Sequence, residues 1–167
     1  MMGARQRSFL FWLGMAVVVV GLDRYTKILA SQFLLLNEPV PVMASLNLTL
    51  LHNAGAAFSL LSDAGGWQRW LFSGLAVIVS IVLVFWIRSV AGRLLLPCAL
   101  ALIMGGALGN LWDRLELGYV VDFIQVYYGQ WYWPAFNLAD SAISIGAVLL
   151  IIDAFRSKDE SSIENSA

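Results

Sequence analysis

The sequence predicts an all-α membrane protein with four transmembrane helices, a small extracytoplasmic β-sheet and a short interfacial helix or loop. Of its 167 residues, 60% are hydrophobic and only 13% are charged, whereas about 25% of a typical soluble chain is charged. Four apolar runs are each long enough to cross the hydrocarbon core of a bilayer. A chain of this length has room for one domain, so we expect residues 1–167 to form a single polytopic membrane domain.

The first apolar run follows a short basic segment that contains Arg5 and Arg7. This start imitates a secretory signal peptide, but no small-x-small cleavage site follows the run, so we expect it to be retained. About 20 residues span the hydrocarbon, which places the first transmembrane segment at residues 8–27. Asp23 and Lys27 then lie near its far end, one turn apart on the same face, where they can form an ion pair.

Two long loops, residues 28–68 and 113–137, are expected on one side of the membrane. Residues 46–50 alternate apolar and polar side chains, a pattern that predicts a half-buried strand. Residues 119–126 are rich in β-branched and aromatic side chains and predict a second strand, which could pair with the first. A Gly/Ala turn and a short apolar stretch at residues 53–59 are too short to span the bilayer and are expected in the interface.

The other three transmembrane segments are expected at residues 69–87, 94–112 and 138–154. Tryptophans flank the first of these, as is typical of membrane–water interfaces. The second ends in a run rich in glycine and alanine, a composition that lets neighbouring helices approach closely. Residues 156–167 are polar and are expected to form a disordered tail.

The basic residues predict the topology. The short turn between Arg88 and Arg93 carries two arginines and no acid, and short loops count most in the positive-inside rule. We therefore expect both termini in the cytoplasm and both long loops outside. The residues expected inside are Arg5, Arg7, Arg88, Arg93, Arg156 and Lys158, and those expected outside are Arg24, Lys27, Arg69 and Arg114.

Polar residues in apolar surroundings concentrate at one predicted depth, near the outer interface. Ionisable residues inside a membrane are candidates for function by default. Most of them also have a simpler interpretation, as ion pairs, a helix cap or a turn. These interpretations apply to Asp23 with Lys27, to Asp113 beside Arg114, to Asn137 at the start of the fourth helix, and to Asn53 with Gly55.

Asp122 and Asp140 fit such interpretations least, because neither has a basic residue within four positions. Two close carboxylates in a low dielectric cannot both ionise easily, so one keeps its proton and the pair titrates as a unit. The ionised member can deprotonate a water molecule while the protonated member hydrogen-bonds the scissile carbonyl, as in aspartic proteases. The sequence therefore predicts that Asp122 and Asp140 form a catalytic pair.

Composition disfavours several other kinds of chemistry. The net charge of −1 gives no indication of a nucleic-acid partner. Cys98 is the only cysteine, so the chain can form no internal disulfide and no thiolate metal site.

Five motifs follow one another along the chain in the order expected of a known family. They are Asp23-x-x-Thr26-Lys27, Asn53-x-Gly55-x-Ala57-Phe58-Ser59, Gly105-Gly106-x-x-Gly109-Asn110-x-x-Asp113-Arg114, Val120-Val121-Asp122-Phe123 and Phe136-Asn137-x-Ala139-Asp140-x-x-Ile143. With them, the chain resembles the bacterial lipoprotein signal peptidases, also called signal peptidase II, which are aspartic membrane proteases.

The resemblance implies four transmembrane helices, a small outer β-sheet and an endopeptidase that removes signal peptides from prolipoproteins. Cleavage would occur before a cysteine that carries diacylglycerol, at the outer leaflet of the bacterial inner membrane. No metal or organic cofactor is implied, and the expected partners are prolipoprotein substrates and membrane lipids, with the enzyme acting as a monomer. By the same resemblance, Asp122 and Asp140 are catalytic, Asn53, Gly55, Asn110, Arg114 and Asn137 bind substrate or orient the pair, and Asp23, Lys27 and Asp113 support them.

Three alternatives remain at this point. A small transporter or channel would use Asp23, Asp122 and Asp140 as ion ligands, although such sites usually lie near the midplane between repeated halves. A different membrane protease would need Lys27 or His52 beside a serine, yet Lys27 has Asp23 one turn away and His52 is expected in a loop. The Gly-x-Gly-Asp motif of presenilin-like proteases does not occur. A structural assembly factor would tolerate the loss of either aspartate.

Overall fold

The computed structural model describes residues 3–55 and 66–164, and only the backbone of residues 157–164. The expected interfacial stretch at residues 53–59 therefore lies largely outside the described residues.

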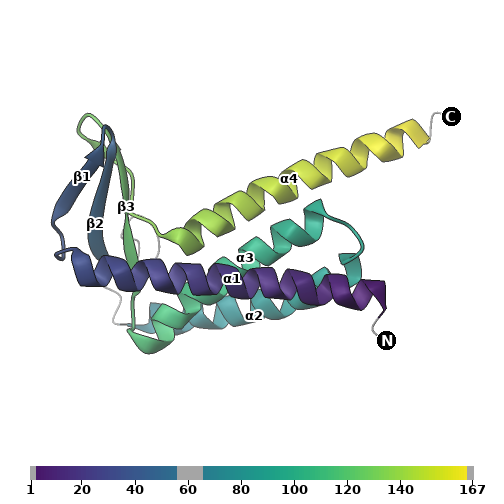
Figure 1. Cartoon of the computed structure of the whole chain (residues 1–167), viewed down its shortest axis with the longest axis horizontal. Helices are drawn as coiled ribbons and strands as arrows, with labels where there is room; N and C mark the ends of the chain where they lie inside the picture. Colours follow the sequence, from purple (N-terminus) through teal and green to yellow (C-terminus); the bar gives the residue numbers. More distant parts are fainter. Residues whose placement is uncertain (1–2, 56–65, 165–167) are drawn as a thin grey trace.

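Four helices form the body of the molecule. Within the described residues, each is long and apolar enough to cross a membrane. They run alternately in opposite directions, so both termini lie at one end of the bundle and a β-sheet lies at the other (Figure 1). The arrangement confirms the predicted fold class. The helices are α1 (Ala4–Phe33), α2 (Trp67–Val90), α3 (Leu95–Glu116) and α4 (Leu138–Glu164).

Two helices extend beyond the boundaries that the sequence predicts. α1 continues to Phe33, past the expected boundary at residue 27, because residues 28–33 contain no glycine or proline to end the helix. α4 continues to Glu164, so the expectation of a disordered tail from residue 156 is wrong for most of that segment. No glycine or proline occurs between residues 147 and 164, and the polar residues there have no strong preference against a helix.

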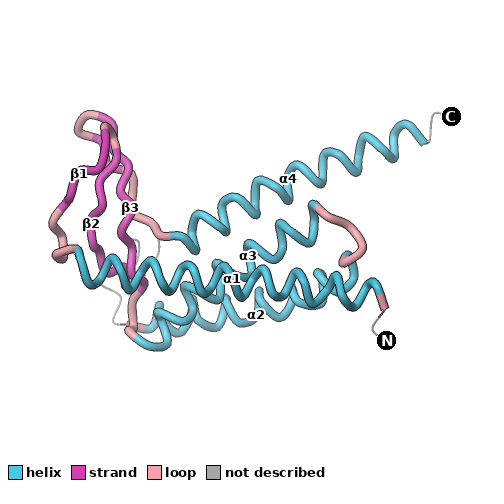
Figure 2. The backbone as a smooth tube through the Cα atoms, viewed as in Figure 1, coloured by secondary structure: helices cyan, strands magenta, loops and turns pink. Residues whose placement is uncertain are grey.

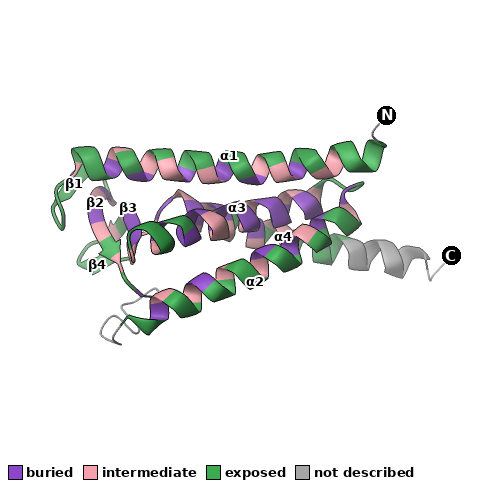
Figure 3. Ribbon diagram, turned by 90° about the horizontal axis from the view of Figure 1, so that it is seen from below, coloured by how far each residue is buried: buried purple, intermediate pink, exposed green. Residues whose placement is uncertain are grey.

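α3 is the helix around which the others pack, since it contacts α1, α2 and α4. Figure 3 shows buried residues concentrated along it, while the other helices have wide exposed faces. Gly105 lies against α1, where an added Cβ would be 2.7 Å from the Cβ of Val19. Gly106 lies against α4, where an added Cβ would overlap the carbonyl of Ala139. The predicted close approach of helices at these glycines is confirmed.

The sheet has four antiparallel strands in the order β1-β2-β3-β4 and lies beyond one end of the helices (Figure 2). The pairing of β2 with β3 confirms the two predicted strands and their partnership, although both are longer than expected. β1, which contains Pro39 and Pro41, was not predicted. It lies at the sheet edge, where the missing N–H of proline is tolerated. The strands are β1 (Pro39–Met43), β2 (Leu46–Asn53), β3 (Val120–Tyr128) and β4 (Trp131–Tyr132).

The β2–β3 register aligns two segments that are far apart in sequence. Leu51 lies opposite Asp122, and Asn53 lies opposite Val120. His52 lies within β2 rather than in the expected loop, and its ring stacks on that of Tyr119 with a centroid distance of 4.0 Å. Burial lowers the pKa of His52.

Candidate active site

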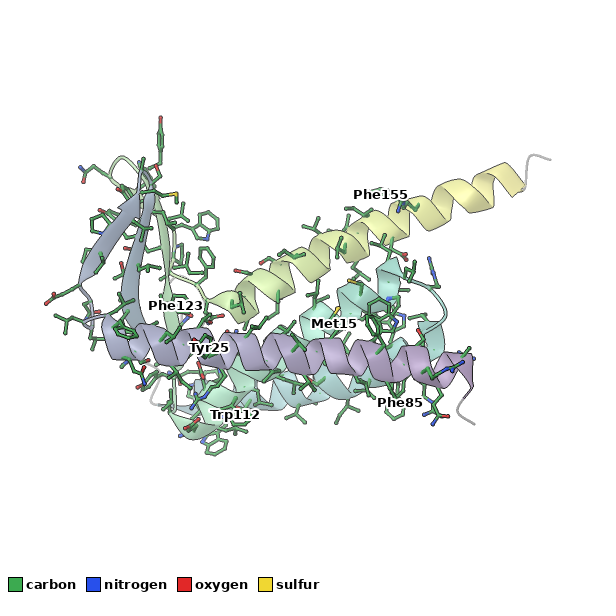
Figure 4. All side chains as sticks on the ribbon, in the orientation of Figure 1. Met15, Tyr25, Phe85, Trp112, Phe123 and Phe155 are labelled. Carbon is green, nitrogen blue, oxygen red and sulfur yellow. The ribbon has the colours of Figure 1, made fainter. Side chains whose placement is uncertain are left out.

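Asp122 lies near the start of β3, where the sheet meets the helices. It is only 2% exposed, so its carboxylate needs protein partners. Asn53 of β2 donates through Nδ2 to Asp122 Oδ2 at 2.9 Å, and Asn137 donates through Nδ2 to Asp122 Oδ1 at 2.7 Å. Figure 4 labels the next residue, Phe123, at this junction. Both Asp122 oxygens are therefore held by neutral amides.

Asp140 lies in the first turn of α4 and forms a reciprocal cap with Asn137. The backbone N–H of Asp140 donates to Asn137 Oδ1 at 2.9 Å, and the backbone N–H of Asn137 donates to Asp140 Oδ2 at 3.2 Å. This is the geometry of a capping box, with Asn and Asp in place of the usual Ser and Glu. Asn137 thus caps the helix, as the simpler interpretation proposes, and also contacts both aspartates.

Asn110 of α3 completes the links around the pair. Its Nδ2 donates to Asp140 Oδ1 at 2.7 Å. Its Oδ1 accepts from Asn137 Nδ2 at 3.1 Å and from Lys27 Nζ at 2.9 Å. Because Lys27 can only donate, it fixes the amide so that the Nδ2 end faces Asp140.

A buried ion cluster contacts the Asn110 amide through Lys27. Lys27 Nζ lies 2.8 Å from Asp23 Oδ2 and 2.9 Å from Asp113 Oδ2, and all three side chains are at most 1% exposed. Asp23 Oδ1 accepts from the backbone N–H of Ala139, and Asp113 Oδ2 accepts from the backbone N–H of Val121. The predicted Asp23–Lys27 ion pair is confirmed, and the cluster ties α1 and α3 to the residues that precede both aspartates.

The sequence suggests the adjacent Arg114 as the partner of Asp113, but the structure shows other partners. Asp113 is bound by Lys27 and by Arg24, whose NH1 lies 3.2 Å from Asp113 Oδ1. Sequence reasoning missed this role of Arg24. Its position three residues before Lys27, on the same helix face, was the available signal.

A cleft of about 570 Å³ opens beside Asp140. Gly55 lies on this cleft, and its N–H donates to Asn53 Oδ1 at 3.1 Å, which turns the Nδ2 of Asn53 toward Asp122. Arg114 lies on another wall, where its NH1 donates to the Asn110 carbonyl at 3.3 Å. The lining comprises Asn53, Gly55, Arg114, Trp133, Pro134, Ala135, Phe136, Asp140, Ser141, Ile143, Ser144 and Ile145.

The electrostatics of Asp122 support proton sharing. Its burial, and then the neighbouring charge of Asp140, raise its pKa to about 7. The amide hydrogen bonds from Asn53 and Asn137 oppose this rise without cancelling it. Near neutral pH, Asp122 is therefore present in both its protonated and its ionised form.

The structure brings all the predicted site residues to one end of the bundle. The two aspartates, the three asparagines and the ion cluster are joined by hydrogen bonds or ion pairs, while Gly55 and Arg114 line the adjoining cleft. Among the side chains that the structure describes, no three acidic, histidine or cysteine groups gather as metal ligands would.

Comparison with known proteins places this geometry in a family. The sequence model described as signal peptidase (SPase) II matches residues 15–156. The lipoprotein signal peptidase of Acinetobacter baylyi is 59% identical over 147 residues, which cover 87% of this chain and 82% of that relative. That of Teredinibacter turnerae is 55% identical over 144 residues, 86% of each chain.

The fold is also similar to that of a solved structure. A bacterial membrane enzyme determined by the in meso method at 2.3 Å resolution is 33% identical, with a TM-score of 0.80 and coverage of 90% of both chains. With the family sequence model matching most of its length, the chain belongs to the signal peptidase II family.

Proposed function

We propose that this chain removes the signal peptide from prolipoproteins through an aspartic dyad formed by Asp122 and Asp140. The family accounts for the peptidase activity and for its aspartic type. One observation carries the assignment of the dyad: Asn137 contacts both carboxylates, through its side chain to Asp122 and through its backbone N–H to Asp140. No other pair of acids at this end is held by neutral amides in the described structure.

The geometry suggests how the pair would act. Asp140 faces the cleft and is half-buried, whereas Asp122 lies behind it. The ionised carboxylate would take a proton from a water molecule, and the protonated carboxyl group would hydrogen-bond the scissile carbonyl. Asn53, Asn110 and Asn137 would hold both carboxyl groups in position, so that little reorganisation is needed during the reaction.

The cleft suits a substrate with both polar and apolar parts. Arg114 and Asn53 offer donors to a peptide backbone, while Trp133, Phe136 and Ile143 form apolar walls. We propose that the cysteine carries diacylglycerol, whose acyl chains would stay in the bilayer while the peptide bond reaches Asp140. Gly55 would allow the peptide close to the backbone, and the enzyme would act as a monomer.

The chain is a protein of the inner membrane, and we propose that its dyad faces outward while both termini lie in the cytoplasm. Residues 1–167 would form one domain with spans close to 8–27, 69–87, 94–112 and 138–154. Arg88 and Arg93 at the end opposite the dyad support this orientation. In a Cys98→Ala background, cysteines introduced one at a time as Val40→Cys and Gln130→Cys should react with a membrane-impermeant thiol reagent added outside intact cells. Labelling of either site only after lysis would contradict the orientation.

The dyad can be tested by cleavage of a purified prolipoprotein in detergent. We expect Asp122→Asn and Asp140→Asn each to abolish cleavage, because a shared-proton pair needs two titratable members. Glu38→Gln, which removes an exposed carboxylate at the same end of the molecule, is the matched control and should cleave normally.

Two further cleavage measurements test other parts of the proposal separately. Substrate without diacylglycerol should be cleaved poorly by the wild-type enzyme, and equal cleavage would contradict the lipid requirement alone. A chelator should leave cleavage unchanged. Substantial turnover by either folded aspartate variant would overturn the dyad.

A further inference from the structure

A second cavity lies at the end of the molecule opposite the aspartates. It has a volume of about 680 Å³ and lies between the start of α1 and the end of α2. Figure 4 labels one of its residues, Phe85, near the N-terminal end of α1. The lining residues are Gly3, Arg5, Gln6, Phe9, Leu10, Phe85, Arg88 and Ser89.

Two guanidinium groups from different helices meet at this cavity. Arg5 of α1 donates to the carbonyl oxygen of Ser89 at 2.6 Å, which anchors its side chain across the gap to α2. Arg88 of α2 lies over the ring of Phe9, 5.8 Å from its centroid. Each contact uses only part of the donor capacity of a guanidinium, which has five N–H groups.

The charges at this cavity are not neutralised by the acids that the structure describes. Among the described side chains, Arg5 and Arg88 form no ion pair, whereas Arg93 in the adjoining turn is paired with Asp153 at 3.0 Å. Two positive charges beside an open cavity at this end of the bundle favour the binding of an anion with several acceptor oxygens. A phosphate group fits because guanidinium forks match its geometry.

The apolar part of the lining indicates that this phosphate belongs to a lipid. Leu10 is 48% exposed and Phe85 is 69% exposed, although both are large and apolar. Further exposed apolar residues continue from them along the same two helices toward the middle of the bundle, including Val17 of α1 and Ile78 of α2. Acyl chains of a bound lipid could lie along these side chains, whereas a free phosphate ion has no apolar part that would contact Phe85 and Leu10.

We propose that this cavity binds the headgroup of an anionic phospholipid, with its phosphate between Arg5 and Arg88. The apolar residues around the cavity hold the start of the acyl chains. The site lies at the opposite end of the helices from the dyad and does not depend on the assignment of the catalytic residues. Basic pockets between membrane helices are known to take such headgroups.

The test uses the full-length wild-type protein, purified in a neutral detergent and stripped of lipid. Phosphatidylglycerol and phosphatidylcholine with identical acyl chains are added separately, and bound lipid is measured by native mass spectrometry. We expect phosphatidylglycerol to bind at least about fivefold more tightly, the preference expected from roughly one arginine contact at a membrane surface. Inorganic phosphate at the same concentration should not compete. Equal binding of both lipids, or full competition by inorganic phosphate, would overturn the proposal.

Variants then locate the site. The double variant Arg5→Gln/Arg88→Gln should lose the preference for phosphatidylglycerol. The matched control Arg7→Gln/Arg156→Gln removes two exposed arginines that lie outside the cavity lining and should keep it. Equal loss in both double variants would show that charge at this end, rather than the cavity, attracts the lipid, and would overturn the site. Should the first variant fail to fold, Arg88→Lys keeps the charge without the guanidinium fork and should weaken the preference.

Discussion

Two groups of acids lie close together at the sheet end of the bundle, and they are held in different ways. Asp23 and Asp113 contact the ammonium group of Lys27, and Asp113 also contacts Arg24. Asp122 accepts its hydrogen bonds from the neutral amides of two asparagines. Asp140 likewise accepts from an asparagine amide and from a backbone N–H.

The different partners favour different roles: a structural role for the ion cluster and, as we propose, a catalytic role for Asp122 and Asp140. An acid that contacts a buried cation cannot gain a proton without weakening that contact. An acid held by amides keeps its position in either protonation state, because an amide supplies both donors and an acceptor. The ion cluster can therefore stabilise the fold, while Asp122 is held in place without a contacting cation.

The largest effect is expected from removing the cation of the ion cluster. Lys27→Met leaves Asp23 and Asp113 buried with fewer partners, and loss of one partner from a buried ion pair costs about 3–5 kcal/mol. The thermal midpoint in detergent should fall strongly. The double variant Lys27→Met/Asp23→Asn should recover part of the loss, since one buried charge is removed with its partner. A midpoint unchanged in Lys27→Met would contradict a structural role for the cluster.

The next effect concerns Asn137, which both caps α4 and donates to Asp122. Asn137→Ala should lower kcat/KM by about 100- to 1000-fold, as expected for loss of a preorganised donor in an active site. It should also lose about 1 kcal/mol of stability, because α4 loses its cap. Asn137→Ser is the matched control for the cap: serine caps helices well but does not restore the amide donor to Asp122. Activity comparable to wild type in Asn137→Ser would reduce Asn137 to a cap.

A smaller effect is expected in the pH dependence of stability. The pKa of Asp122 is raised from 3.8 to about 7 in the folded protein. Between these values the unfolded chain has released the proton that the folded chain retains, so this group lowers stability as pH rises. Below pH 3.8 it contributes nothing, and above pH 7 the penalty is constant at a few kcal/mol at most.

Asp122→Asn removes this contribution. Its thermal midpoint, compared with that of wild type at each pH, should therefore rise between about pH 4 and pH 7. The variant Glu38→Gln, which changes an exposed carboxylate, should not show this rise. A constant difference between Asp122→Asn and wild type would show that the pKa of Asp122 is not raised.

The smallest effect is the fall of activity above neutral pH. If the pair needs one proton, kcat/KM should decline about tenfold for each pH unit once both carboxyl groups are ionised. The pKa of Asp122 places the start of this decline near pH 7. A pH–rate profile of cleavage measures it, and activity that stays level to pH 9 would argue against a shared proton.

Much of this molecule was predictable from local patterns. Apolar runs predict helices whatever the rest of the chain does, because a bilayer demands internal hydrogen bonding over a known length. The i, i+4 spacing of Asp23 and Lys27 predicts their ion pair, which the structure confirms. The helix ends were less predictable, and the mistaken tail at residue 156 shows that polar composition alone does not end a helix.

Local sequence patterns therefore predict the four helices, two of the paired strands and the residues that the structure gathers at the candidate site. Which of those residues are in contact depends on how the elements pack together. The contact of Asn53 with Asp122 depends on the register between strands separated by 69 positions. The choice of Lys27 and Arg24 as partners of Asp113 depends on how α1 packs against α3. The Arg5–Arg88 cavity likewise depends on α1 and α2 meeting at their ends. Spacing along one element places side chains on a common face, but only packing between elements determines what that face meets.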